Sequence, residues 1–75
     1  MTQLDLLNKQ PLTDKESIIY ELVRRNPRIT TYEIQDYCRD NRVTNCADRY
    51  IRWCQQKGYI EGERFKGNQK RWRAV

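Results

Sequence analysis

The sequence predicts a small α+β domain in which three amphipathic helices precede a C-terminal two-stranded β-hairpin. Two stretches begin with a threonine that is followed three residues later by a glutamate, which is the capping-box pattern of a helix N-terminus. Apolar residues recur at helical spacing in three segments, and after Gly58 they recur at every second position, as in strands. A chain of 75 residues accommodates one such domain.

The first helix is expected at residues 14–25. Thr13 and Glu16 form its capping box, and one apolar stripe follows, made of Ile18, Ile19, Leu22 and Val23. The helix should stop at Asn26, because the residue before Pro27 is pushed out of the helical region.

The second helix is expected at residues 31–39, after a short extended residue, Ile29. Thr30 is the expected N-cap, and Glu33 completes the second capping box. The core positions follow at i, i+3 and i+4, and they are Ile34, Tyr37 and Cys38. The polar stretch RDNRVT after this helix is expected to form a turn.

The third helix should begin with Thr44 or Asn45 as its cap and run to about residue 57, where Gly58 supplies a left-handed residue. The spacing i, i+3, i+4 and i+7 defines its buried side as Ala47, Tyr50, Ile51 and Cys54. The residues away from that side are Asn45, Asp48, Arg49, Arg52 and Gln56. This helix therefore has an apolar face for the core and a separate face that carries arginines.

Two strands are expected at residues 59–65 and 69–75, joined by a turn in which Gly67 and Asn68 tolerate positive φ. Trp72 should pack from the second strand against the core, with its indole edge near the surface. The hairpin is strongly basic, because it carries Arg64, Lys66, Lys70, Arg71 and Arg73.

Residues 12–75 form the expected domain, and residues 1–11 are expected to be a flexible N-terminal arm. Three leucines of the arm are candidates for docking on the domain or on a partner, namely Leu4, Leu6 and Leu7. The arm has no long apolar run, so we expect neither a signal peptide nor a membrane span, and a cytoplasmic location.

The net charge of +5 is concentrated in the second half of the chain. Residues 1–41 carry six Lys/Arg and seven Asp/Glu, whereas residues 42–75 carry nine Lys/Arg and three Asp/Glu. This asymmetry favours a polyanionic partner.

The composition argues against an enzyme. The chain has no His, which is the commonest general base and metal ligand. Its three cysteines, Cys38, Cys46 and Cys54, form no CxxC pair, and each is expected to pack in the core. We therefore expect no catalytic residue, metal, cofactor or small-molecule ligand.

The order helix, short strand, helix, turn, helix, hairpin resembles the winged helix-turn-helix family over residues 13–75. The resemblance rests on ITTYEIQDYC for the positioning helix and on ADRYIRWCQQKGYI for the recognition helix that runs into the wing. The turn RDNRVT is longer than in many bacterial regulators, and cysteines replace leucines at two core positions. Asp48 and Arg52 stand where winged helices that read left-handed Z-DNA have an Asn and a Tyr, so we exclude that subfamily.

The resemblance implies a small double-stranded DNA-binding protein of the bacterial or phage type, acting as a transcriptional regulator. The helix at about 44–57 would lie in the major groove, and the basic wing at 61–74 would follow the backbone. Base contacts would come from Asn45, Arg49 and Arg52, because an Arg fork matches guanine and an Asn amide matches adenine. Asp48 could accept from cytosine, but the preferred role is to orient Arg52 from one turn away, because an acid at a phosphate surface usually costs affinity.

The expected phosphate contacts come from two regions. The start of the second helix and the turn after it contribute Thr30, Thr31, Tyr32, Arg42 and Thr44. The wing contributes Arg64, Lys66, Asn68, Lys70, Arg71 and Arg73.

Other functions stay open at this level. The domain could serve as a protein-interaction adaptor, or as a phage-encoded inhibitor of a host nucleic-acid enzyme, through Leu4, Leu6, Leu7 and Trp53. It could also be an architectural or recombination-directionality factor that bends DNA, or bind RNA. A homodimer is a further alternative, since one recognition helix reads only a short site.

Overall fold

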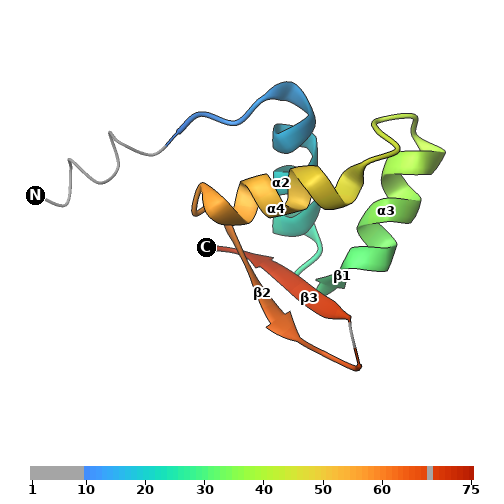
Figure 1. Ribbon diagram of the computed structural model, residues 1–75, viewed down its shortest axis with the longest axis vertical. Helices are drawn as coiled ribbons and strands as arrows, with labels where there is room; N and C mark the ends of the chain where they lie inside the picture. Colours follow the sequence, from blue (N-terminus) through green and yellow to red (C-terminus); the bar gives the residue numbers. More distant parts are fainter. Residues whose placement is uncertain (1–9, 68) are drawn as a thin grey trace, which may run out of the picture.

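The computed structural model describes residues 10–67 and 69–75, which form a small α+β fold with three helices and one three-stranded antiparallel sheet (Figure 1). Along the chain the elements are α2 (Asp14–Arg25), β1 (Ile29–Thr30), α3 (Thr31–Asp40), α4 (Ala47–Gln56), β2 (Ile60–Arg64) and β3 (Lys70–Ala74).

The first two helices begin at their capping boxes, as predicted. The Thr13 N–H donates to Glu16 Oε1 at 2.9 Å, and α2 has the predicted bounds. In α3, the Thr30 N–H donates to Glu33 Oε1 at 2.9 Å while the Glu33 N–H donates to Thr30 Oγ1 at 3.2 Å. These reciprocal bonds satisfy N–H groups that have no partner within the helix. α3 ends at Asp40, one residue later than predicted.

The predicted start of the third helix is wrong, because α4 begins at Ala47 with Cys46 as its N-cap. Thr44 Oγ1 accepts the N–H of Cys46 at 3.0 Å, so its hydroxyl closes a local turn instead of capping a helix. Arg42 adopts a positive φ of 54°, and the chain leaves α3 there. The other end follows the prediction, with Gly58 at a φ of 86° directly after the C-cap.

The sheet has one strand more than the predicted hairpin. Its order is β1-β3-β2, and Ile29 and Thr30 pair with Trp72 and Arg71 of β3. The sequence indicated an extended Ile29 but not its pairing, since two residues are too few for an alternating pattern. The hairpin strands match the prediction to within one residue at each end.

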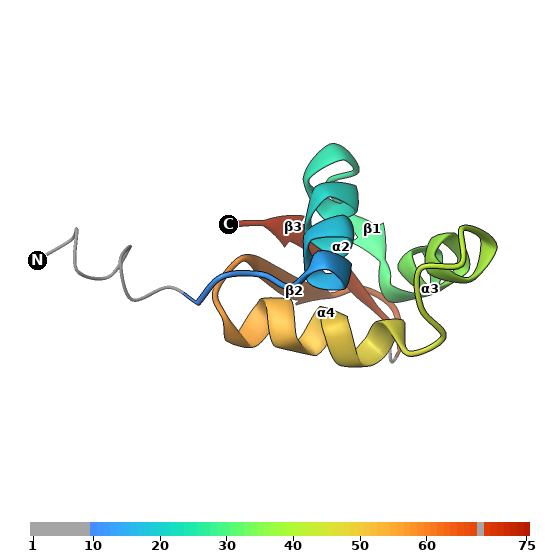
Figure 2. The same ribbon diagram turned by 90° about the horizontal axis from the view of Figure 1, so that it is seen from above.

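The core lies between the helices and the sheet, and α2 packs against both α4 and β3 (Figure 2). It consists of Ile19, Val23, Ile29, Ile34, Cys38, Ala47, Ile51, Cys54, Ile60 and Trp72. Five predicted core residues are not in it. Ile18 and Tyr37 are each 40% exposed, Cys46 is exposed, and Leu22 is half-buried beside the core. α3 buries only Ile34 and Cys38, a narrower stripe than the predicted three positions. Tyr50 is half-buried at the margin of the core.

The chain before α2 is attached at the C-terminal end of α4. The Tyr59 hydroxyl donates to the Gln10 carbonyl at 2.7 Å, and Lys57 Nζ donates to the Pro11 carbonyl at 3.1 Å. The last two residues of the predicted arm therefore contact the domain, whereas residues 1–9, with their leucines, lie outside the described residues. No helix in the described part of the chain has both the length and the apolar character needed to cross a membrane.

Candidate nucleic-acid interface

The exposed side of α4 carries the arginines that the sequence placed there. Ala47, Ile51 and Cys54 are buried at i, i+4 and i+7, which turns the opposite side of the helix toward solvent. The residues on that opposite side are Asp48, Arg49, Arg52 and Gln56, and all four are exposed. The predicted division of this helix into a core face and an Arg-bearing face is confirmed.

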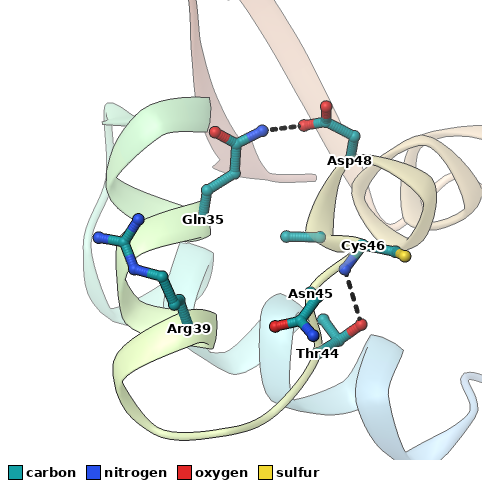
Figure 3. A pocket seen from close by; sticks show the side chains of 7 residues that line it. Gln35, Arg39, Thr44, Asn45, Cys46 and Asp48 are labelled. Atoms are coloured by element: carbon teal, nitrogen blue, oxygen red, sulfur yellow. Dashed lines mark hydrogen bonds between the residues drawn. The ribbon is translucent and has the colours of Figure 1, made fainter.

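Asn45 is not part of this helix, because it lies in the loop that precedes α4. It lines a hollow of about 400 Å³ between α3 and the first turn of α4, together with Arg39 from α3 (Figure 3). The prediction that Asn45 shares the helix face with Arg49 and Arg52 is therefore wrong. Arg39 was not among the predicted site residues, and it pairs with Asp36 at 2.8 Å.

The Asp48 side chain does not orient Arg52. Gln35 Nε2 of α3 donates to Asp48 Oδ1, as Figure 3 shows, and no ion pair joins Asp48 to Arg52 among the residues described. The expected pairing is wrong, since α3 packs against α4 and brings the Gln35 amide to the Asp48 carboxylate. The Gln35–Asp48 bond fixes the two helices relative to each other.

The basic side chains of the hairpin lie on two opposite faces. In β2 and β3, Gly62 is opposite Trp72 and Arg64 is opposite Lys70, so these four residues share one face of the ribbon. A Cβ at Gly62 would lie 2.7 Å from the Trp72 ring, which places the indole against the Gly62 backbone. Trp72 is 4% exposed, so this face continues from the core.

The outer face of the hairpin carries Arg71 and Arg73. Arg73 pairs with Glu61, its cross-strand neighbour. The guanidinium of Arg71 lies 3.6 Å from the centroid of the Phe65 ring. Both cations thus have partners within the domain and point away from the Trp72 face. Alternation along β3 separates Lys70 from Arg71 and Arg73, and the register of the two strands adds Arg64 to the face of Lys70.

One hollow joins three parts of the chain that are distant in sequence. It has a volume of about 190 Å³ and is lined by Thr31, Asp48, Ile51, Arg52, Gln55, Lys70 and Trp72. Arg52 comes from α4, Lys70 from β3, and Thr31 from the first turn of α3. The Trp72 Nε1–H donates to Thr31 Oγ1 at 2.8 Å, which holds the start of α3 against the sheet. The prediction that Trp72 packs on the core is confirmed.

The two cations of this hollow have no carboxylate partner in the part of the chain that the structure describes. Within residues 10–67 and 69–75, neither Arg52 nor Lys70 makes an ion pair, and Lys70 Nζ lies 5.7 Å from the centroid of the Trp72 ring. Asp48 also lines the hollow, with Gln35 bound to its carboxylate. A guanidinium fork and an ammonium around one small hollow have the chemistry to bind a phosphate group.

The other residues predicted to contact the DNA backbone do not gather at one place. Thr30 uses its hydroxyl in the cap of α3, and Tyr32 in the first turn of that helix is 66% exposed. Arg42 lies past the far end of the ten-residue α3, roughly 15 Å from Thr31 at 1.5 Å per residue. Lys66 is exposed in the hairpin turn, and Asn68 lies outside the described residues. The structure therefore brings together Thr31, Arg52 and Lys70 but not Arg42.

No protein-family model, curated protein or solved structure matches this chain. Among the residues that the structure describes, no group of three or more His, Cys, Asp or Glu side chains could hold a metal ion.

Proposed function

We propose that this protein is a winged helix-turn-helix that binds double-stranded DNA and regulates transcription. In this arrangement α4 lies in the major groove, which is wide enough to admit a helix. The hairpin face that carries Arg64 and Lys70 follows the adjacent phosphate backbone. Arg49 and Arg52 then face the base edges or the phosphates nearest to them.

The observation that carries the proposal is the meeting of Arg52 and Lys70 around one hollow. Unpaired cations from separate elements repel each other, so their convergence favours an anion between them. The excess of positive charge in residues 42–75 extends the same attraction over α4 and the hairpin. Thr31 is the first residue of α3, so the positive end of that helix dipole borders the hollow and also favours an anion.

Fluorescence anisotropy with a labelled duplex, measured across a salt series, tests the proposal. We expect the Arg52→Ala/Lys70→Ala variant to bind more weakly, with a slope of log K against log salt that is shallower by roughly 2. The matched control is Arg71→Ala/Arg73→Ala, which removes the same charge from the outer hairpin face. Equal losses in both variants would contradict this interface, and absence of binding by the wild type at low salt would reject DNA as the partner.

Self-association or a protein partner is the second candidate function, and one observation favours it. A hollow of about 460 Å³ lies on the side of α2 and includes Ile18, Leu22 and Tyr37. Two of these side chains, Ile18 and Tyr37, are large and 40% exposed. Sedimentation velocity of the wild type and of Ile18→Asp tests self-association. A dimer that dissociates in the variant supports it, and a monomer in both rejects it.

A further inference from the structure

Trp53 is a large apolar side chain on the exposed part of α4, and its ring is held by neighbours on the same helix. The side chain is 39% exposed. The ring makes an edge contact with Tyr50, with centroids 5.3 Å apart and an interplanar angle of 88°. The guanidinium carbon of Arg49 lies 6.0 Å from the Trp53 centroid. These contacts orient the indole before any partner binds.

The Trp53 ring shares a hollow with both arginines of the helix. This hollow has a volume of about 530 Å³ and is lined by Cys46, Asp48, Arg49, Arg52 and Trp53. It is separate from the smaller hollow that contains Lys70, and Arg52 borders both. An apolar ring and two guanidinium groups therefore face the same space.

The major groove presents hydrogen-bonding groups on every base pair and a single kind of apolar group, the C5-methyl of a pyrimidine. Guanidinium forks match the acceptors of guanine, whereas the carbon atoms of an indole match only the methyl group. We propose that Trp53 binds the C5-methyl group of a pyrimidine and so contributes sequence preference. This inference rests on the proposed function. The methyl group comes from thymine or from 5-methylcytosine, and the experiment separates the two.

The test begins with selection of bound duplexes from a random-sequence pool by the wild-type protein. The best duplex is then compared with a copy in which uracil replaces every thymine, which removes the methyl groups and keeps all the hydrogen-bonding edges. We expect the uracil duplex to bind about fourfold more weakly for each methyl that Trp53 contacts.

Three variants isolate the contribution of Trp53. In Trp53→Ala the ratio of thymine to uracil affinity should fall to one, and in Trp53→Phe a smaller preference should persist. Arg52→Ala, which removes the arginine of the hollow that makes no ring contact with Trp53 among the described residues, should lower the affinity for both duplexes and keep the ratio. Circular dichroism checks that each variant retains its helices. A ratio above one that is unchanged in Trp53→Ala would overturn the proposal, because the methyl group would then act through DNA shape or another residue.

The source of the methyl group is decided by a second pair of duplexes, in which cytosine or 5-methylcytosine occupies the selected positions. If 5-methylcytosine raises the affinity over cytosine as much as thymine raises it over uracil, Trp53 responds to the methyl group alone. If only thymine raises the affinity, the contact is assigned to thymine. A selected pool with no enriched thymine, or equal affinity for the thymine, uracil and 5-methylcytosine duplexes, overturns the inference. Duplex binding in that case leaves the proposed function standing, whereas loss of all duplex binding removes both.

Discussion

The Lys57 ammonium donates to Glu16 Oε1 at 2.6 Å, joining the end of α4 to the first turn of α2. The Glu16 side chain is 1% exposed and the Lys57 side chain 18%. The same carboxylate oxygen accepts the N–H of Thr13, and the same ammonium donates to the Pro11 carbonyl. The Glu16 carboxylate that caps α2 is therefore also one half of a buried ion pair. Through Glu16 and Lys57, this pair links α2, α4 and the segment before α2.

Removal of the ammonium should destabilise the fold strongly. Lys57→Met leaves the Glu16 carboxylate buried without its partner, so we expect the free energy of unfolding to fall by about 3 kcal/mol. Urea denaturation at pH 7, followed by circular dichroism, measures this change. Arg24→Met is the matched control, because it breaks the solvent-exposed pair with Glu21 and should have little effect. A loss in Lys57→Met no larger than in the control would contradict the prediction.

Acid should weaken the same contact. Burial raises the pKa of the Glu16 carboxyl, but the hydrogen bonds from Lys57 and Thr13 and the charge of Lys57 outweigh it, so the pKa lies below its ordinary value. A carboxyl whose pKa is lower in the folded state stabilises the fold above its unfolded pKa of about 4.3, and this stabilisation is lost as the pH falls through the folded value. The difference in unfolding free energy between wild type and Glu16→Gln should therefore shrink from pH 7 to pH 3. An equal difference at both pH values would exclude this role.

A methyl group at Gly62 should disturb the hairpin where it meets the core. The added Cβ would lie 2.7 Å from the Trp72 ring, which is buried and bound to Thr31, so the indole has little room to move. We expect Gly62→Ala to lower the free energy of unfolding by about 1–3 kcal/mol. Urea titrations followed by Trp72 fluorescence, in a Trp53→Phe background, measure this. Glu63→Ala at the adjacent exposed position is the control, and equal stability of the two variants would be evidence against the contact.

The three thiols should differ in reactivity. Cys46 is exposed, whereas Cys38 and Cys54 are fully buried. Burial raises the pKa of the Cys38 thiol, and burial followed by the charge of Glu16 raises the pKa of Cys54 to about 11. Because the thiolate is the reactive form, iodoacetamide at pH 8 should modify one site in the folded protein and three in urea. Mass spectrometry counts the adducts. Rapid modification of folded Cys46→Ser would contradict this assignment.

Local sequence signals located most elements of the fold. The bounds of α2 were predicted correctly because Thr13, Glu16 and Pro27 act within a few residues of the ends of the helix. The start of α4 was missed because Thr44 has the residue type of a cap but bonds the N–H two residues ahead. Nothing in the local sequence distinguishes these two uses of a threonine hydroxyl.

The candidate interface was predictable only in part. The spacing of apolar residues placed Arg49 and Arg52 on the exposed side of α4, as found. Alternation along β3 separates Lys70 from Arg71 and Arg73, but the placement of Lys70 and Arg52 around one hollow depends on tertiary packing. The position of Asn45 depends on where the helix begins. A list of basic residues could not separate those that share a hollow from those that do not.

The order of helices and strands, the helix caps and the basic second half of this protein follow from short-range patterns, because each depends on residues within a turn or two of one another. Tertiary structure alone decided which distant residues meet. Ile29 pairs with Trp72, Lys57 reaches Glu16, and Arg52 and Lys70 line one hollow. These contacts exist only after the helices pack on the sheet, because the entropy of the unfolded chain opposes bringing distant segments together until the burial of the core stabilises them.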